Sequence, residues 1–217
     1  MIYVVKHYED EKLYPYGYTE LKVGDIFISH GCDNIEYLNK YINELTGLYY
    51  IWKNVNDDVV GLCHYRRFLY DRNEGGILSW ENAQYLANSY DIVVSEHTYV
   101  PCGIRESLLQ QFPNSQSTVI KYIDFLVNLE PNLEYYYNTC IFNPTNLFIA
   151  KKDIIDNYCK WVFPLIVPAA ERFKVEDSKK SNNELYQRIV GFLSERLLSY
   201  YIQKEKLNYK ELQVQVI

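Results

Sequence analysis

Hydrophobic residues follow two different spacings along the chain, and the order of these spacings predicts an α/β sheet. Short apolar runs rich in β-branched residues predict strands at residues 2–5, 59–67, 91–96 and 146–150, with a further short strand at 25–29. Apolar residues three and four positions apart predict helices at 34–55, 79–88, 105–112, 117–134, 154–166 and 184–206, and the charged segment 171–183 is expected to be a loop. Since strands and helices alternate, we expect a mostly parallel central sheet with helices on both faces.

Polar residues at the ends of the predicted strands are candidates for binding a ligand. His7 follows the first strand, and His64, Arg66 and Arg67 end the strand at 59–67. In a doubly wound sheet, the carboxyl ends of strands and the amino ends of the following helices face one crevice. The helix at 34–55 carries polar residues at its amino end or beside its apolar stripe, namely Asn34, Asn39, Asn43, Glu44 and Thr46.

The adjacent arginines of "HYRR" allow two interpretations. Alternation along an extended strand would place the histidine and Arg66 on one side, and the tyrosine and Arg67 on the other. The guanidinium groups would then either pair with core carboxylates such as Glu44 or Glu195, or bind a phosphate or carboxylate ligand through their planar fork. The residues alone leave both interpretations open.

A second charged pair interrupts the apolar face of the predicted last helix. Glu195 and Arg196 lie among apolar residues that recur at helical spacing. They form either a buried structural ion pair, which must be well satisfied to offset desolvation, or a site in which the carboxylate serves as a general base or substrate anchor.

Composition predicts a single globular domain, in which any anion-binding site must be local. With 217 residues, 48% of them hydrophobic, the chain can bury one sizeable core, and no linker or repeat divides residues 1–217. A net charge of -6 gives no general attraction to nucleic acid or to an anionic membrane. The sequence also lacks the glycine-rich phosphate loops and the hydrolase motifs that identify the commonest NTPases, dehydrogenases and hydrolases.

Cysteine usage and hydropathy favour a cytoplasmic protein. Five widely spaced cysteines with no C-x-x-C pair are typical of reduced thiols, and the apolar run before Lys6 is too short for a signal segment. The segment "KWVFPLIVPAAERF", residues 160–173, is too short in its apolar part to span a bilayer. It is expected to be a buried or surface-lying helix end, with peripheral membrane contact as the alternative.

Four runs of the sequence together resemble a known family. They are "DNIEYLNKYINELTGLYYIWKN", "VVGLCHYRRFL", "NLFIAKKDIIDNYCKWVF" and "RIVGFLSERLL", and the similarity extends in order from "IYVVKH" to about Tyr201. They resemble the DUF4422 family, glycosyltransferase-like proteins of bacterial capsule, exopolysaccharide and lipopolysaccharide loci. The resemblance implies a single GT-A-like α/β domain and a transferase of the hexosyltransferase type. Its donor would be a nucleotide sugar, ordinarily UDP-linked, and its acceptor a lipid-linked glycan or oligosaccharide reached at the inner face of the cell membrane.

The resemblance also implies roles for residues of this chain. His64, Arg66 and Arg67 would hold the donor diphosphate, and Glu195 would be the general base or acceptor anchor, beside Arg196 and Arg188 in the last helix. Position 36 is Glu here, where the family often has Ser. The positions that match the family in the donor-binding part are His7, Asn34, Asn39, Glu44, Thr46 and Asn146.

The strand end at "HYR" departs from GT-A-like folds, which usually carry a metal-binding Asp-x-Asp motif there. Guanidinium groups can neutralise a departing diphosphate in place of a cation, so transfer without a metal is expected. A divalent cation is possible but not expected, and no residue is assigned as a metal ligand. The rival functions are a non-catalytic module that binds nucleotide sugars or carbohydrate, and a sugar nucleotidyltransferase, which would need a glycine-rich phosphate loop that the sequence lacks.

Overall fold

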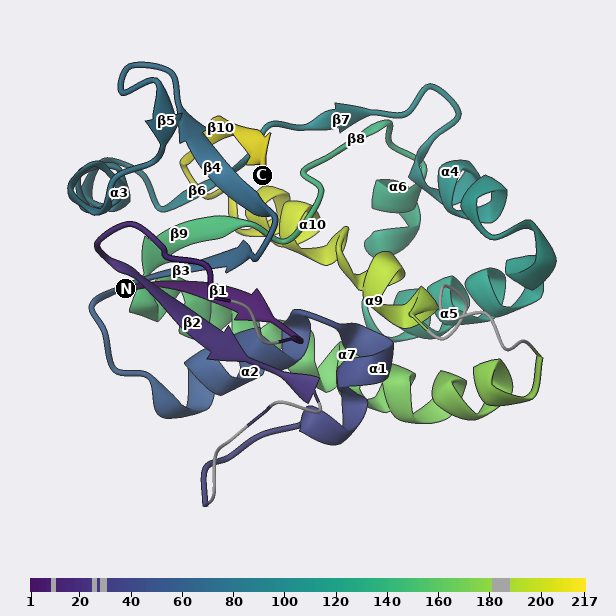
Figure 1. The fold of residues 1–217 in the computed structure, drawn as a ribbon. Helices are drawn as coiled ribbons and strands as arrows, with labels where there is room; N and C mark the ends of the chain where they lie inside the picture. Colours follow the sequence, from purple (N-terminus) through teal and green to yellow (C-terminus); the bar gives the residue numbers. More distant parts are fainter. Residues whose placement is uncertain (9–10, 25–26, 28–30, 181–187) are drawn as a thin grey trace.

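A mixed sheet organises the fold in a computed structural model of the chain (Figure 1). The structure describes residues 1–8, 11–24, 27, 31–180 and 188–217, with 174–180 described by their backbone only. Most of the strand expected at 25–29 therefore lies outside the described residues. The order of neighbours in the main sheet is β2-β1-β3-β9-β6-β10-β4-β5, and β7 and β8 pair separately. The strands are β1 (Ile2–Lys6), β2 (Tyr18–Lys22), β3 (Val59–His64), β4 (Arg67–Asp71), β5 (Gly76–Ile77), β6 (Ile92–Ser95), β7 (Thr98–Tyr99), β8 (Ile141–Phe142), β9 (Phe148–Lys151) and β10 (Tyr209–Val216).

The strand directions are mixed, so the expected mostly parallel sheet is only partly right. β1 pairs in parallel with β2 and β3, and β6 pairs in parallel with β10. β9 runs antiparallel to both β3 and β6, and β4 runs antiparallel to β10. β9 begins at the edge where β3 and β6 end, because residues 143–146 return the chain to that edge. Apolar runs predict a strand without predicting the edge from which the chain enters it.

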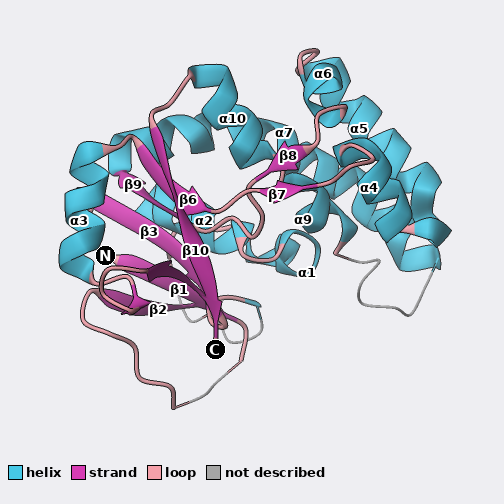
Figure 2. Ribbon diagram, turned by 90° about the horizontal axis from the view of Figure 1, so that it is seen from above, coloured by secondary structure: helices cyan, strands magenta, loops and turns pink. Residues whose placement is uncertain are grey.

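Side-chain alternation along the strands divides the core between the two faces of the sheet. Val60 and Leu62 of β3 belong to the larger core cluster, whereas Val59 and Cys63 of the same strand belong to the smaller one. Helix α3 supplies the alanines of the smaller cluster, and α2, α7 and α10 pack on the opposite face. Figure 2 shows α3 on one side of the sheet and α4, α5 and α6 gathered on the other. Helices therefore lie on both faces.

The helices follow the predicted pattern, with three breaks. They are η2 (Glu36–Leu38), α1 (Asn39–Ile42), α2 (Leu45–Asn54), α3 (Trp80–Ser89), α4 (Ile104–Gln111), η3 (Pro113–Ser115), α5 (Gln116–Leu129), α6 (Leu133–Tyr137), α7 (Lys152–Lys180), α9 (Ile189–Ser194) and α10 (Leu197–Glu205). The expected helix 34–55 is interrupted at Asn43, whose φ is 53°. The expected helix 117–134 is divided into α5 and α6 by residues 130–132. The expected last helix, 184–206, has its first residues, 184–187, outside the described residues, and it is interrupted at Glu195 and Arg196.

Helix α7 is longer than its sequence pattern predicts. It continues past Pro164 and Pro168 to Lys180, so the loop expected at 171–183 is helical as far as the described backbone extends. Each proline removes one hydrogen bond of the helix, which is why a boundary near residue 166 was the expectation. No helix within the described ranges combines the length and apolarity needed to cross a lipid bilayer.

Strand β10 lies inside the sheet although its sequence is half polar. It pairs with β6 over Tyr209 to Leu212 and with β4 over Gln213 to Val216. The sequence pattern "YKELQVQV" alternates as a half-buried strand should, yet no strand was predicted there. Its position between two other strands makes it a structural element on which both depend.

A chain shortened to end at Asn208 should not fold stably. Without β10, the backbone groups of β6 and β4 that face it lose their partners. We expect the free energy of unfolding to fall by more than about 5 kcal/mol, the lower end of the range for natural domains. Urea denaturation followed by circular dichroism measures this, with the exposed Lys210→Ala variant as the control that should unfold like the wild type. Cooperative unfolding of the shortened chain at an unchanged midpoint would contradict the prediction.

Candidate active site

The sequence "HYRR" forms a tight hairpin, which changes which of its side chains share a face. β3 ends at His64, Tyr65 and Arg66 make the turn, and β4 begins at Arg67 directly opposite His64. The expected single strand to Arg67, with Arg66 beside the histidine, is therefore wrong. Residues paired across two strands point to the same side of a sheet, so the hairpin brings His64 and Arg67 together. Tyr65 is buried, and Arg66 is exposed.

Positive charge gathers around this hairpin. Burial, followed by the nearby charges of Arg67, Arg66, His7 and Arg188 in that order, lowers the pKa of His64 to about 3. Burial, followed by Arg188 and Arg66, also lowers the pKa of His7. Both imidazoles are therefore neutral at pH 7, while the guanidinium groups remain charged. His7, Arg66 and Arg188 are exposed and His64 and Arg67 are half-buried, so an anion can reach them.

Two carboxyl groups lie next to these arginines. Burial raises the pKa of Glu44, against the hydrogen bond from Asn146 and the charges of Arg188 and Arg67. Burial and the charge of Glu44 raise the pKa of Glu195 to about 7, against the effect of Arg196, Arg67 and Arg188. The amide Nδ2 of Asn146 donates to Glu44 Oε1 at 3.0 Å. The two carboxyl groups thus compete for ionisation within one positively charged region.

Backbone positions with positive φ hold this arrangement. Asn43, immediately before Glu44, has φ 53°, and Thr145 and Asn146 have φ 76° and 51°. Non-glycine residues with positive φ are uncommon, and they persist only where surrounding contacts fix them. The helix break at Asn43 turns the chain, and the next residue, Glu44, lies beside Asn146. A continuous helix from 34 to 55 would have no such turn.

Arg188 is positioned through a contact between α1 and α9. Its Nε donates to Asn43 Oδ1 at 2.6 Å. Gly191 on α9 makes this approach possible, since a Cβ there would come within 2.3 Å of Asn43 Nδ2 and 3.1 Å of the Tyr41 carbonyl oxygen. The first and last parts of the chain thus meet at the candidate site.

Several predicted site residues support the backbone around the site. Asn39 donates to Thr46 Oγ1 at 2.8 Å, and Thr46 donates to the Asn43 carbonyl oxygen at 2.9 Å. Both contacts hold the helix break. Asn34 accepts from the Glu36 backbone N–H at 3.2 Å and so closes a local turn. These contacts account for Asn34, Asn39 and Thr46 without a ligand.

Arg196 is enclosed by protein. Its Nη1 donates to Glu195 Oε2 at 3.1 Å and to the Phe192 carbonyl oxygen, and its guanidinium carbon lies 4.4 Å from the centre of the Phe142 ring. Its exposed fraction is 5%. In contrast, neither Arg66 nor Arg67 has an ion pair with a carboxylate among the described residues. The core ion pair considered for the "HYRR" arginines is therefore made by Arg196 instead.

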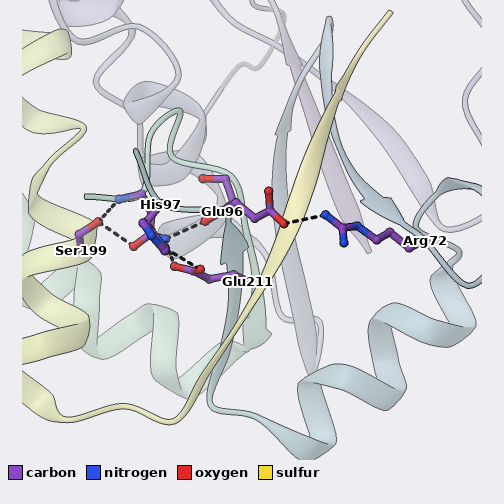
Figure 3. Close-up of polar contacts among 7 residues, drawn as sticks. Arg72, Glu96, His97, Ser199 and Glu211 are labelled. Carbon is purple, nitrogen blue, oxygen red and sulfur yellow. Dashed lines mark hydrogen bonds and ion pairs between the residues drawn. The ribbon is translucent and has the colours of Figure 1, made fainter. Parts of the chain in front are cut away.

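A second polar cluster was not predicted from the sequence (Figure 3). Asn143 donates through Nδ2 to the Ser95 carbonyl oxygen at 2.7 Å and to Glu211 Oε1 at 2.8 Å, and it accepts at Oδ1 from Ser199 Oγ at 3.0 Å. His97 Nδ1 lies 2.9 Å from Glu211 Oε2. Figure 3 shows His97, Ser199 and Glu211 pointing toward one another. The sequence carried one signal for this cluster: His97 directly follows the strand predicted at 91–96, just as His7 follows the first predicted strand.

Comparisons with known proteins place this fold and family. The fold is shared with the bifunctional glycosyltransferase WbbM, whose apo structure matches with a TM-score of 0.81 and 24% sequence identity over 100% of this chain and 45% of its own. This chain therefore spans less than half the length of WbbM. The DUF4422 family model, described as a domain of unknown function, matches residues 1–206, and the chain belongs to that family. No curated protein matches the chain.

The raised pKa of Glu195 can be measured directly. We expect its carboxyl carbon to titrate near pH 7 in the wild type and at lower pH in Glu44→Gln, because the variant removes a neighbouring negative charge. Carbon-detected NMR of selectively labelled protein measures both titrations. The matched control is Glu81→Gln on α3, across the sheet, which should leave the Glu195 titration in place. An unchanged titration in Glu44→Gln would show that the two carboxyl groups do not interact.

Proposed function

We propose that the chain is a glycosyltransferase that moves a sugar from a nucleotide-sugar donor, UDP-linked, to a bacterial surface glycan. The observation that carries this proposal is an accessible group of arginines. Arg66 and Arg67 lie in the hairpin that ends β3, and their charges and that of Arg188 add to burial in lowering the pKa of His64. A diphosphate carries the opposite charge and offers several oxygens to planar guanidinium donors. The fold shared with WbbM supports the same function.

The donor diphosphate would lie against the "HYRR" hairpin. Arg66 and Arg67 flank the end of β3 and would neutralise the charge that develops on the leaving diphosphate. His64 is neutral at pH 7, and because its Nδ1 accepts from the Arg66 backbone N–H, its Nε2 would donate one hydrogen bond there. Asn146 holds Glu44 beside this edge through its Nδ2, and its buried Oδ1 has no hydrogen-bond partner among the described residues.

A divalent cation does not fit this strand edge well. Such a cation is held by carboxylate and carbonyl oxygens, whereas the hairpin presents guanidinium and imidazole groups. Two acidic groups interact with Arg67 and Arg188, namely Glu44, which is bonded to Asn146, and Glu195, which is bonded to Arg196. The arginines are therefore proposed to do the work that a cation would do in the Asp-x-Asp arrangement.

Glu195 is proposed as the group that accepts the proton of the acceptor hydroxyl. A general base works best when its pKa lies near the working pH, and burial with the Glu44 charge brings the pKa of Glu195 to about 7. Arg196 fixes one of its oxygens. The acceptor would be a lipid-linked glycan or oligosaccharide, reached from the cytoplasm at the inner face of the membrane, with the segment 160–173 as a peripheral contact.

Arginine substitutions test the donor site. Arg66→Ala and Arg67→Ala should each weaken binding of UDP-sugars by roughly 10- to 100-fold, the effect of removing a hydrogen bond between charged groups. Isothermal titration calorimetry with a panel of nucleotide sugars, with and without manganese, measures this. The control Arg72→Ala removes an exposed arginine that pairs with Glu96, and should bind like the wild type. Binding that requires manganese and ignores both substitutions would overturn the proposed role of the hairpin.

The pH dependence of UDP release tests Glu195. The base form of Glu195 increases as pH rises through about 7, so UDP release from UDP-sugars should increase over the same interval. In Glu195→Gln the rate should fall at least about 100-fold, and this rise should vanish, while UDP-sugar affinity persists. If the wild type binds UDP-sugars but releases no UDP with or without acceptor extract, the chain is a non-catalytic binding module.

A further inference from the structure

We infer that the pocket beside the His97–Glu211 pair binds a single sugar ring of the acceptor, which rests on and deepens the proposed glycosyltransferase function. The pocket has a volume of about 140 Å³. Pockets for drug-sized ligands measure roughly 300–1,000 Å³, so this one suits one monosaccharide unit and not a whole nucleotide. Its lining includes His97, Asn143, Gln203, Tyr209, Glu211 and Ile141.

Glu211 has the hydrogen-bonding capacity that a sugar needs. Its Oε1 accepts from Asn143 and its Oε2 pairs with His97. A carboxylate offers about four lone-pair positions, and these contacts use two of them. One further position on each oxygen is left for a hydroxyl group, and two oxygens of one carboxylate match two adjacent hydroxyls of a sugar. The exposed fraction of the Glu211 side chain, 23%, shows that it can be reached.

Asn143 fixes that carboxylate in place. Both hydrogens of its amide group are used, on the Ser95 carbonyl oxygen and on Glu211 Oε1, and its Oδ1 accepts from Ser199. Its backbone N–H donates to Ser199 Oγ at 2.7 Å. A side chain held at both ends cannot turn away, so Glu211 is oriented before any ligand arrives. Preorganisation of this kind lowers the entropy lost on binding.

The rim of the pocket is apolar and exposed. Tyr209 and Ile141 both line the pocket, with exposed fractions of 47% and 45%. Tyr99, which pairs with Ile141 across β7 and β8, is 64% exposed. Sugar rings have apolar C–H faces as well as hydroxyl groups, and an aromatic ring with a polar tip can cover such a face. A purely structural ion pair would explain the contact of Glu211 with His97, but not this rim.

The pocket is connected to the candidate active site through two short routes. Asn143 faces the pocket and Asn146, three residues later, bonds to Glu44. Phe142 lines the pocket, and its ring lies against the guanidinium group of Arg196, which bonds to Glu195. A sugar held by Glu211 would thus lie next to the elements that position the proposed base, as an acceptor must.

NMR with simple glycosides tests the inference on the full chain. The probes are the methyl glycosides of glucose, galactose, mannose and N-acetylglucosamine, added to labelled protein in the presence of UDP. We expect at least one of them to shift the side-chain amide signals of Asn143 and Gln203. Glu211→Gln should weaken binding of that glycoside by at least about tenfold, as expected for loss of a charged hydrogen-bond acceptor. Glu81→Gln is the matched control on α3, and should bind like the wild type.

A second variant and a second ligand keep the outcomes separate. Tyr209→Ser removes a half-exposed ring from the pocket. It should weaken binding of the same glycoside, and it provides a test even if Glu211→Gln fails to fold. If UDP binds in calorimetry but no glycoside shifts the pocket signals, the acceptor site is overturned and the proposed donor site stands. If glycosides bind but neither UDP nor UDP-sugars do, the proposed transferase function fails while the pocket is a sugar site. Shifts that persist unchanged in both variants would place the sugar elsewhere and overturn the inference.

Discussion

Mutual repulsion among positive groups is the constraint on which the candidate site depends. Burial lowers the pKa of His64 most, and the nearby charges of Arg67, Arg66 and Arg188 add to this effect and bring the pKa to about 3. The folded chain therefore holds like charges together at one edge of the sheet. Such an arrangement is unfavourable without opposite charge nearby. Glu44 and Glu195 supply part of that charge, and the charge of Glu44, after burial, raises the pKa of Glu195. The remaining positive charge is what makes the edge receptive to an anionic ligand.

The backbone supplies the order that this charge distribution needs. A sharp hairpin sets Arg67 opposite His64, and a helix break at Asn43 sets Glu44 beside Asn146. The chain again adopts positive φ at Thr145 and Asn146 before β9. Segments far apart in sequence therefore meet at one sheet edge. Residues 143–146 have a special place among them, because they reach toward the charged edge at one end and the His97–Glu211 pocket at the other.

Sequence patterns located the main elements better than their connections. The strands predicted at 59–67, 91–96 and 146–150 correspond to β3, β6 and β9, and the helix predicted at 79–88 corresponds to α3. Predictions of helix boundaries from these patterns were wrong where tertiary contacts override periodicity. Asn43 lies within regular apolar spacing yet marks a break, since Arg188, which is distant in sequence, bonds to it. The break at Glu195 and Arg196 likewise has a distant contact, because the Arg196 guanidinium group lies against the Phe142 ring. β10 was not predicted, although its alternating pattern is typical of a strand, and that pattern does not indicate that the strand lies between β6 and β4.

The sequence alone determined an α/β fold, the family, and a histidine and arginine group at a strand end, because local spacing and residue type are sufficient for these. Only the tertiary structure decided how the group is used. It reversed the direction of β9 and placed His64 and Arg67 on one side. It also enclosed Arg196 while leaving Arg66 exposed, and joined Asn143 to Glu211 across 68 residues. Charge and burial depend on neighbours in space, and no spacing along the chain specifies those neighbours.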